Sequence, residues 1–278
     1  MKYIVIGITG TAIFLAVNFI GYLFLIRPAK YDKKRMKGLL GWDYAHRGLY
    51  DNKKMIYENT AESFARAVKA GYGIELDVQM TKDGELVVFH DFSLFRMCGI
   101  NKRVDEMTYE EIRRLPINNS DSRIPLFSNI LDLIAGRVPL IVEMKSDRRS
   151  GEICVKANEI LENYSGVFCV ESFNAYIVYW YKLNRPDIIR GQLSMDFMKA
   201  NEKSDNGYRF LLKYLMLNFI QKPDFIAYRY SDSKNISLRI CKRLYKTICV
   251  GWTITSQVEY NNASGFFDVI IFEGFLPE

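Results

Sequence analysis

The sequence predicts an α/β protein, a (β/α)₈ TIM barrel that follows one N-terminal transmembrane helix. Short apolar runs recur as candidate strands, and stretches with helix-type signals lie between most of them. Ahead of them, residues 3–26 contain no Asp, Glu, Lys or Arg. Two parts are therefore expected, a membrane anchor with a basic segment over residues 1–37 and a barrel over residues 38–278. A doubly wound open sheet is the alternative that periodicity leaves open.

The anchor prediction depends on the length of the apolar run from Tyr3 to Ile26. As a helix, these 24 residues would reach about 36 Å, enough to cross a hydrocarbon core of roughly 30 Å. A cleaved signal peptide is the alternative, but no small-x-small cleavage site is evident. The basic residues that follow predict a single-pass protein of the cell membrane with a cytoplasmic main domain. They also suit contact with anionic head groups.

The formal charge of +6 is confined to the N-terminus. Residues 1–37 carry seven Lys or Arg and one acid, Asp32, so the rest of the chain is neutral. A surface that follows a nucleic-acid backbone is therefore not expected. The five cysteines are odd in number and form no CxxC pair, which argues against a disulfide framework and against a zinc site.

Nine short runs are the candidate strands. Eight of them would build the barrel, and one more follows the Asp83-Gly84 turn. The eight are residues 42–46, 74–79, 140–145, 167–172, 188–193, 225–229, 247–253 and 268–272, and the additional strand is 85–89.

Capping signals mark helices between the strands. Asn59 is expected to cap the first helix, with Glu62 at the third position and Gly71 at the end. Thr108 and Glu111 form a second capping box. The strongly apolar residues 210–220 are expected to be a barrel helix packed inward, and the alternative is a helix that rests on the bilayer surface.

Acidic residues recur at alternate positions inside two candidate strands. Alternate residues point the same way, so Glu75 and Asp77 would present two carboxylates to one side, and Glu143 and Lys145 would likewise share a side. Acids inside apolar parallel strands are poorly explained as a solvated face. Three converging carboxylates suit a divalent metal ion, Ca²⁺ or Mg²⁺, rather than Zn²⁺.

The chain has only two histidines, and each ends a candidate strand beside a charged residue, as His46-Arg47 and His90-Asp91. An imidazole with its ordinary pKa of about 6.5 can serve as base or acid near neutral pH. Arg47 can fork onto phosphate oxygens, and Lys145 can add a positive charge. Cleavage of a phosphodiester needs this combination of proton acceptor, proton donor and cations.

These residues lie in a series of motifs that resembles the glycerophosphodiester phosphodiesterase family. The resemblance covers nearly all of residues 42–278. Its motifs are Ala45-His46-Arg47-Gly48, Glu58-Asn59-Thr60, Ile74-Glu75-Leu76-Asp77-Val78, Thr81-Lys82-Asp83-Gly84, Val87-Val88-Phe89-His90-Asp91, Val142-Glu143-Met144-Lys145, Glu171-Ser172-Phe173 and Gly251-Trp252-Thr253.

The resemblance implies a metal-dependent barrel hydrolase that converts glycerophosphodiesters to sn-glycerol 3-phosphate and an alcohol. It implies attack by the glycerol 2-hydroxyl through a cyclic phosphate, while direct attack by water stays open. The residues it assigns are His46 and His90 as acid and base, Glu75, Asp77 and Glu143 as metal ligands, and Arg47, Lys145, Glu171 and Trp252 as phosphate and substrate contacts.

Three functions are compatible with these features. The first is membrane-tethered hydrolysis of soluble glycerophosphodiesters. The second is a lysophospholipase D that acts on lipid with one remaining acyl chain. The third is a catalytically silent barrel used for binding or regulation, and the complete set of acids and histidines argues against it.

Two positions depart from the family pattern. The family usually ends its last strand with Thr-Asp and a nearby proline, whereas this chain has Phe272-Glu273 there. Tyr57 replaces the proline that commonly precedes Glu58. The expected catalytic set remains complete, but the pocket floor and the C-terminal closure of the barrel stay unpredicted.

Overall fold

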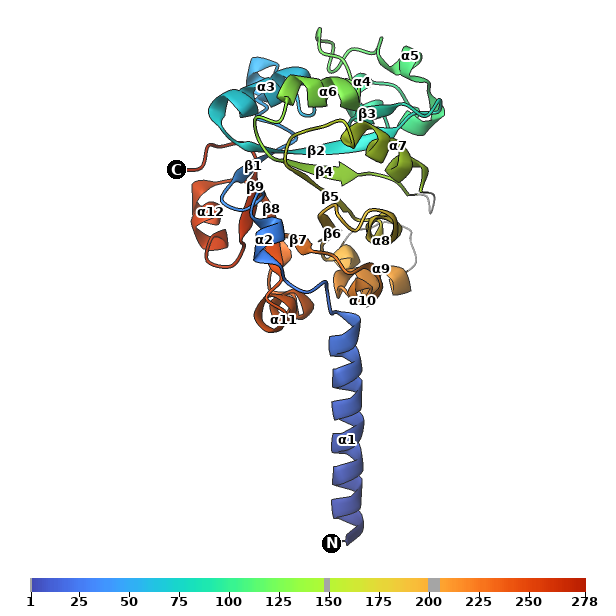
Figure 1. Cartoon of the computed structure of the whole chain (residues 1–278), viewed down its shortest axis with the longest axis vertical. Helices are drawn as coiled ribbons and strands as arrows, with labels where there is room; N and C mark the ends of the chain where they lie inside the picture. The colour runs from blue at the N-terminus through green and yellow to red at the C-terminus, as the bar shows by residue number, and fades with distance from the viewer. Residues whose placement is uncertain (1, 148–150, 200–205) are drawn as a thin grey trace.

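The computed structural model describes residues 2–147, 151–199 and 206–278 (Figure 1). In this part of the chain, nine strands form one sheet in the order β1-β9-β8-β7-β6-β5-β4-β2-β3. β1 also pairs with β2, so eight parallel strands close a barrel, and β3 pairs antiparallel with β2. The predicted barrel is confirmed.

The strands begin and end within two residues of the predicted positions. In β2, every residue from Gly73 to Gln79 is buried, as expected for a strand covered on both faces. The strands are β1 Asp43–His46, β2 Gly73–Met80, β3 Leu86–Val88, β4 Leu140–Met144, β5 Phe168–Ser172, β6 Arg190–Ser194, β7 Phe225–Arg229, β8 Ile248–Ile254 and β9 Val269–Phe272.

Helices surround the barrel (Figure 1). Their buried apolar faces and the outward-facing side chains of the strands form the main core. The α-helices are α1 Lys2–Leu25, α2 Lys33–Met36, α3 Ala61–Ala70, α4 Phe95–Cys98, α5 Tyr109–Ile112, α6 Phe127–Ile134, α7 Glu152–Leu161, α8 Ala175–Asn184, α9 Asn206–Lys213, α10 Asn218–Gln221, α11 Ile236–Leu244 and α12 Gln257–Ala263. The 3-10 helices are η1 Asn52–Lys54, η2 Val104–Glu106, η3 Phe197–Lys199 and η4 Tyr230–Asp232.

A long excursion, residues 81–126, leaves the barrel between β2 and α6. It contains β3, α4 and α5 and has a small core of its own that includes Phe89, Leu94 and Ile112. The predicted Thr108–Glu111 capping box starts α5. The excursion carries His90, which therefore reaches the site from outside the barrel wall.

The cap of α3 differs from the prediction. Thr60, not Asn59, is the N-cap, and its hydroxyl accepts from the Ser63 N–H in a reciprocal capping box. Asn59 has a φ of 56° and donates from Nδ2 to Asp77 Oδ2 at 2.8 Å. Adjacent residues that both carry a side-chain oxygen satisfy the same capping rule, so the sequence does not separate them.

Helix α1, Lys2–Leu25, projects from the barrel as a stalk (Figure 1). Its end is docked, because Tyr22 and Leu23 pack on the core and Ile26 is fully buried. Among the described residues, no helix is long and apolar enough to cross a membrane. The predicted span over residues 3–26 is therefore not supported, and its last residues belong to the barrel.

The apolar residues 210–220 do not form one barrel helix. They include the end of α9, a turn and α10. Leu212 and Leu215 are buried, whereas Phe210 and Ile220 are exposed. The prediction of inward packing holds for part of this segment.

Candidate active site

All nine residues singled out in the sequence meet at the C-terminal ends of the barrel strands, where active sites of such barrels lie. Strand register explains the meeting, because Asp77 pairs with Glu143 and Glu143 pairs with Glu171. Asp77 and Lys145 form an ion pair at 3.3 Å beside Glu143. The other seven line one cavity of about 40 Å³ and are His46, Arg47, Glu75, His90, Glu143, Glu171 and Trp252.

Glu75, Asp77 and Glu143 form one acidic cluster. An oxygen of each carboxylate lies within 4.8 Å of the others. The three residues are 2%, 0% and 6% exposed. Buried carboxylates require a cation or a proton, and a set of oxygen ligands alone suits Ca²⁺ or Mg²⁺.

Two cations face this cluster. Lys145 Nζ lies 2.8 Å from Glu143 Oε1, and Arg47 Nε lies 3.4 Å from Asp77 Oδ2. Glu171 lies beside the cluster and brings the number of carboxylates to four. Among the described residues of this group, only Arg47 and Lys145 carry positive charge to balance them. The two negative charges in excess match the charge of one divalent cation.

The pKa values of the acids reflect this imbalance. Burial, reinforced by neighbouring carboxylates, raises the pKa of Glu75 and that of Glu171 well above the usual range. Burial also opposes ionisation of Asp77, but Lys145 and other nearby cations outweigh it and lower the pKa of Asp77. Without a bound cation, the cluster therefore retains protons that a cation would displace.

His46 is held by a hydrogen bond to Glu273, a residue near the C-terminus. Its Nδ1 lies 2.5 Å from Glu273 Oε2, and its Nε2 lies 3.9 Å from Glu75 Oε2. Only 14% of the His46 side chain is exposed. Burial lowers the pKa of His46 although Glu273 acts against it, which favours the neutral ring.

His90 is held by residues of its own excursion. Its Nδ1 lies 2.6 Å from Asp91 Oδ1, and 31% of its side chain is exposed. Arg96 Nε donates to the other Asp91 oxygen at 2.5 Å. Burial acts to raise the pKa of Asp91, but hydrogen bonds from His90 and Arg96 lower it overall.

Glu58 links the two histidine loops. It accepts from Arg47 at 2.8 Å and from Arg96 at 2.6 Å. Arg47 in turn donates its backbone N–H to Glu75 at 3.1 Å. Glu58 therefore shapes the loop after β1 and connects it to the excursion.

Trp252 and Phe173 form the apolar wall of the cavity. Their rings pack edge to face with centroids 5.6 Å apart. The buried Trp252 Nε1 has no hydrogen-bond partner within the described part of the chain. The indole thus contributes an apolar face to the cavity.

Glu273 is a site residue to which the sequence pattern assigned no role. It stands where the family pattern has Asp, and β9 closes the barrel by pairing with both β1 and β8. The departure at Phe272-Glu273 therefore leaves the barrel closed. An acidic residue after the last strand was the signal that could have identified it.

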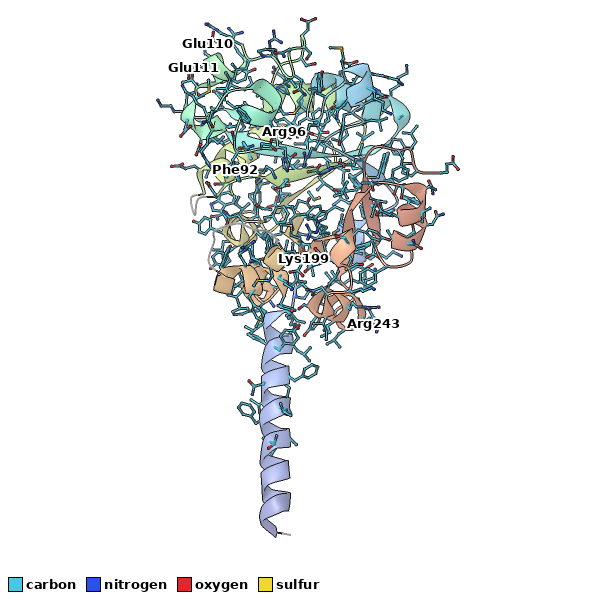
Figure 2. All side chains as sticks on the ribbon, turned by 180° about the vertical axis from the view of Figure 1, so that it is seen from behind. Phe92, Arg96, Glu110, Glu111, Lys199 and Arg243 are labelled. Atoms are coloured by element: carbon cyan, nitrogen blue, oxygen red, sulfur yellow. The ribbon has the colours of Figure 1, made fainter. Side chains whose placement is uncertain are left out.

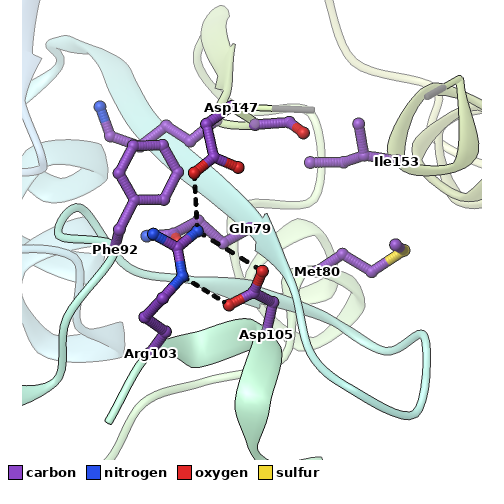
Figure 3. A pocket seen from close by; sticks show the side chains of 9 residues that line it. Gln79, Met80, Phe92, Arg103, Asp105, Asp147 and Ile153 are labelled. Atoms are coloured by element: carbon purple, nitrogen blue, oxygen red, sulfur yellow. Dashed lines mark hydrogen bonds and ion pairs between the residues drawn. The ribbon is translucent and has the colours of Figure 1, made fainter. Parts of the chain in front are cut away.

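Two further cavities are lined in part by Lys145. The larger, about 450 Å³, extends from Glu143 and Lys145 between Phe173, Phe197 and Leu212. The smaller, about 30 Å³, has an ion-pair cluster on its wall (Figure 3). In this cluster Arg103 lies over the Phe92 ring, 5.1 Å from its centroid, and pairs with Asp105 at 2.8 Å and Asp147 at 2.9 Å.

The sequence matches the glycerophosphoryl diester phosphodiesterase family over residues 46–214, more than half of the chain. A glycerophosphodiester phosphodiesterase of Bacillus altitudinis is 38% identical over 109 residues, which are 37% of this chain and 43% of that protein. The human lysophospholipase D GDPD1 is 26% identical over 176 residues, which are 56% of this chain and 54% of that protein. The chain spans about half the length of the curated relatives it matches.

The fold is similar to that of solved phosphodiesterases. One, from Oleispira antarctica, was solved with the product sn-glycerol 3-phosphate and has a TM-score of 0.69 at 19% identity, with 85% of this chain and 94% of that chain covered. Another, a glycerophosphodiester phosphodiesterase from Thermotoga maritima, has a TM-score of 0.62 at 22% identity, with 82% and 92% covered. The sequence match and the barrel agree: this chain belongs to the glycerophosphoryl diester phosphodiesterase family.

Proposed function

We propose that this protein hydrolyses glycerophosphodiesters to sn-glycerol 3-phosphate and an alcohol with the help of a divalent cation. The observation that carries the proposal is that two histidines line one cavity together with Glu75 and Glu143, which form a buried acidic cluster with Asp77. The family match and the product bound to the Oleispira enzyme support the same reaction.

The metal ligands of the proposal are Glu75, Asp77 and Glu143. Their oxygen atoms, their burial and the excess of negative charge fit Ca²⁺ or Mg²⁺. A bound cation would supply positive charge to the phosphoryl oxygens as negative charge develops there. Arg47 and Lys145 would add two fixed cations for the same oxygens.

His46 and His90 are the proton-transfer residues of the proposal. One ring removes the proton of the glycerol 2-hydroxyl, which attacks phosphorus, and the other ring protonates the leaving alkoxide. Water then opens the cyclic phosphate with the proton transfers reversed. Glu171 and Trp252 line the same cavity and would contact the glycerol.

A lysophospholipid is the second candidate substrate, and the larger cavity favours it. That cavity meets the acidic cluster at Glu143 and Lys145, and its walls include Phe92, Phe197 and Leu212. Apolar walls of this kind suit an aliphatic chain better than a small polar head group. A lysophospholipase D is also among the relatives in sequence.

We also propose that α1 attaches the protein to the cell membrane, with the barrel on the cytoplasmic side. The stalk exposes Phe14, Val17 and Ile20, and Arg27 and Lys30 follow it. Exposed apolar side chains beside cations suit anionic lipid. The full chain should sediment with membranes and resist extraction by salt. Recovery in the supernatant would contradict this attachment.

The reaction is tested with the full chain in detergent and two substrates, glycerophosphocholine and lysophosphatidylcholine. With Mg²⁺ or Ca²⁺, we expect sn-glycerol 3-phosphate from the first, identified by ³¹P NMR. Chelator and Asp77→Asn should each reduce turnover by at least about 100-fold, while the exposed Glu110→Gln should not. Lysophosphatidic acid from the second substrate alone would select the second candidate. Two intact substrates would contradict both.

A further inference from the structure

Glu273 contacts His46 where β9 pairs with β1 and closes the barrel. β9 and β1 are parallel neighbours with Phe272 opposite Ala45, so Glu273 and His46 follow at the same level. The Glu273 N–H donates to the Ile254 carbonyl at 2.9 Å, which fixes the backbone after β9. The chain thus brings a carboxylate and an imidazole into contact across 227 positions of sequence.

We propose that Glu273 is a positioning residue that sets the tautomer of His46 and makes His46 the general base, an inference that rests on the proposed function. An ionised carboxylate only accepts hydrogen bonds, so the proton of the neutral ring lies on Nδ1, 2.5 Å from Glu273 Oε2. Nε2 is then free of a proton. This nitrogen is on the side of Glu75, a residue that lines the cavity, at 3.9 Å.

The Nε2 lone pair of His46 takes the proton of the glycerol 2-hydroxyl while its oxygen forms a bond to phosphorus. The bond from phosphorus to the alcohol oxygen breaks, and that oxygen receives a proton from His90. Glu273 balances the positive charge on His46. When water opens the cyclic phosphate, His90 takes a proton from the water and His46 returns its proton to the 2-oxygen.

Tyr50 is a further neighbour of this carboxylate. Burial and the nearby Glu273 carboxylate raise the pKa of the Tyr50 hydroxyl, so Tyr50 keeps its proton beside Glu273. The contact between Glu273 and His46 keeps the ring in one position before substrate arrives.

The test compares Glu273→Gln, Glu273→Asp and the surface variant Glu110→Gln in the full chain with glycerophosphocholine. An amide can donate to Nδ1 and select the wrong tautomer, so Glu273→Gln should lower kcat by about 100-fold with little change in KM. Glu273→Asp keeps the negative charge, so its kcat should be about tenfold higher than that of Glu273→Gln. In ¹⁵N NMR spectra, the His46 ring should carry its proton on Nδ1 in the wild type and shift toward Nε2 in Glu273→Gln.

Several outcomes would overturn the inference. They are an unchanged kcat in Glu273→Gln, equal losses in the Gln and Asp variants, or a wild-type ring protonated on Nε2. Thermal melts of each variant separate these results from misfolding. The NMR measurement needs no turnover. If no diester is cleaved, the proposed function fails while the tautomer still decides whether Glu273 positions His46.

Discussion

The two histidines share one cavity, but different parts of the molecule hold them. His46 ends a barrel strand, is 14% exposed and contacts a carboxylate from the other end of the chain. His90 lies on the excursion, is 31% exposed and contacts the residue next to it, Asp91. The barrel thus supplies a ring kept neutral by burial, which suits a base. The excursion supplies a ring nearer to solvent, to which the proposal assigns protonation of the departing alcohol.

The largest expected effect separates these two roles. His46→Ala and His90→Ala should each lower kcat with glycerophosphocholine by about 10³-fold, because each removes a proton-transfer group. A p-nitrophenyl diester has a leaving group that departs without a proton. In single-turnover measurements of nitrophenol release, which report the first step alone, it should therefore restore most of the rate of His90→Ala and none of that of His46→Ala.

The control for this experiment is Glu110→Gln, at the outer edge of the excursion (Figure 2). It should match the wild type with both diesters. Equal rescue of the two histidine variants would remove the distinction between base and acid. Rescue of His46→Ala alone would reverse it.

A smaller effect is expected from Arg96, which bonds to Asp91, the partner of His90, and to Glu58. Its guanidinium binds Asp91 through Nε and Glu58 through both terminal nitrogens. Lysine cannot reproduce this fork, so Arg96→Lys should lower kcat with glycerophosphocholine by about tenfold. The loss should shrink with the p-nitrophenyl diester, because His90 is then not needed as an acid.

The matched control is Arg113→Lys, whose guanidinium pairs with Glu110 on the surface. This variant should keep full activity. If Arg96→Lys loses the same factor with both diesters, Arg96 supports the whole site through Glu58 rather than His90 alone.

The same contrast explains what the sequence could predict. The barrel was predicted from apolar runs that alternate with helix-type stretches along the chain. The acidic cluster was predicted from acids at alternate positions within β2 and β4, since parallel strands in register place Asp77 beside Glu143. The Asp91 contact of His90 is adjacent in sequence and was visible as a pair. These features depend on local pattern and on the fold class.

The remaining features depend on contacts that only the closed structure defines. Glu273 meets His46 because β9 pairs with β1, and the sequence does not specify that register. Asn59 turns to Asp77 rather than to the helix end. The end of α1 is buried by α10 and α11, where Asn218 donates to the Ile26 carbonyl at 3.1 Å. Hydropathy alone could not separate this docked turn from the apolar run before it.

The smallest expected effect concerns stability, and it tests the charge excess of the acidic cluster. Burial raises the pKa of Glu171 well above the ordinary 4.5. A carboxyl group with a raised folded-state pKa stabilises the fold below its unfolded pKa, and this contribution is lost as the pH rises through the folded value. In chelator, Glu171→Gln should therefore equal the wild type near pH 4 and exceed it near pH 8 by on the order of 1 kcal/mol.

Denaturant unfolding of both proteins at several pH values measures this difference. Saturating Mg²⁺ or Ca²⁺ should reduce it, because a cation near the cluster favours the ionised carboxylates. Glu110→Gln, a fully exposed acid, should show no gain at high pH. A Glu171→Gln advantage that is constant with pH would mean that the pKa of Glu171 is the same in the folded and unfolded states, and the argument for two unbalanced negative charges would then fail.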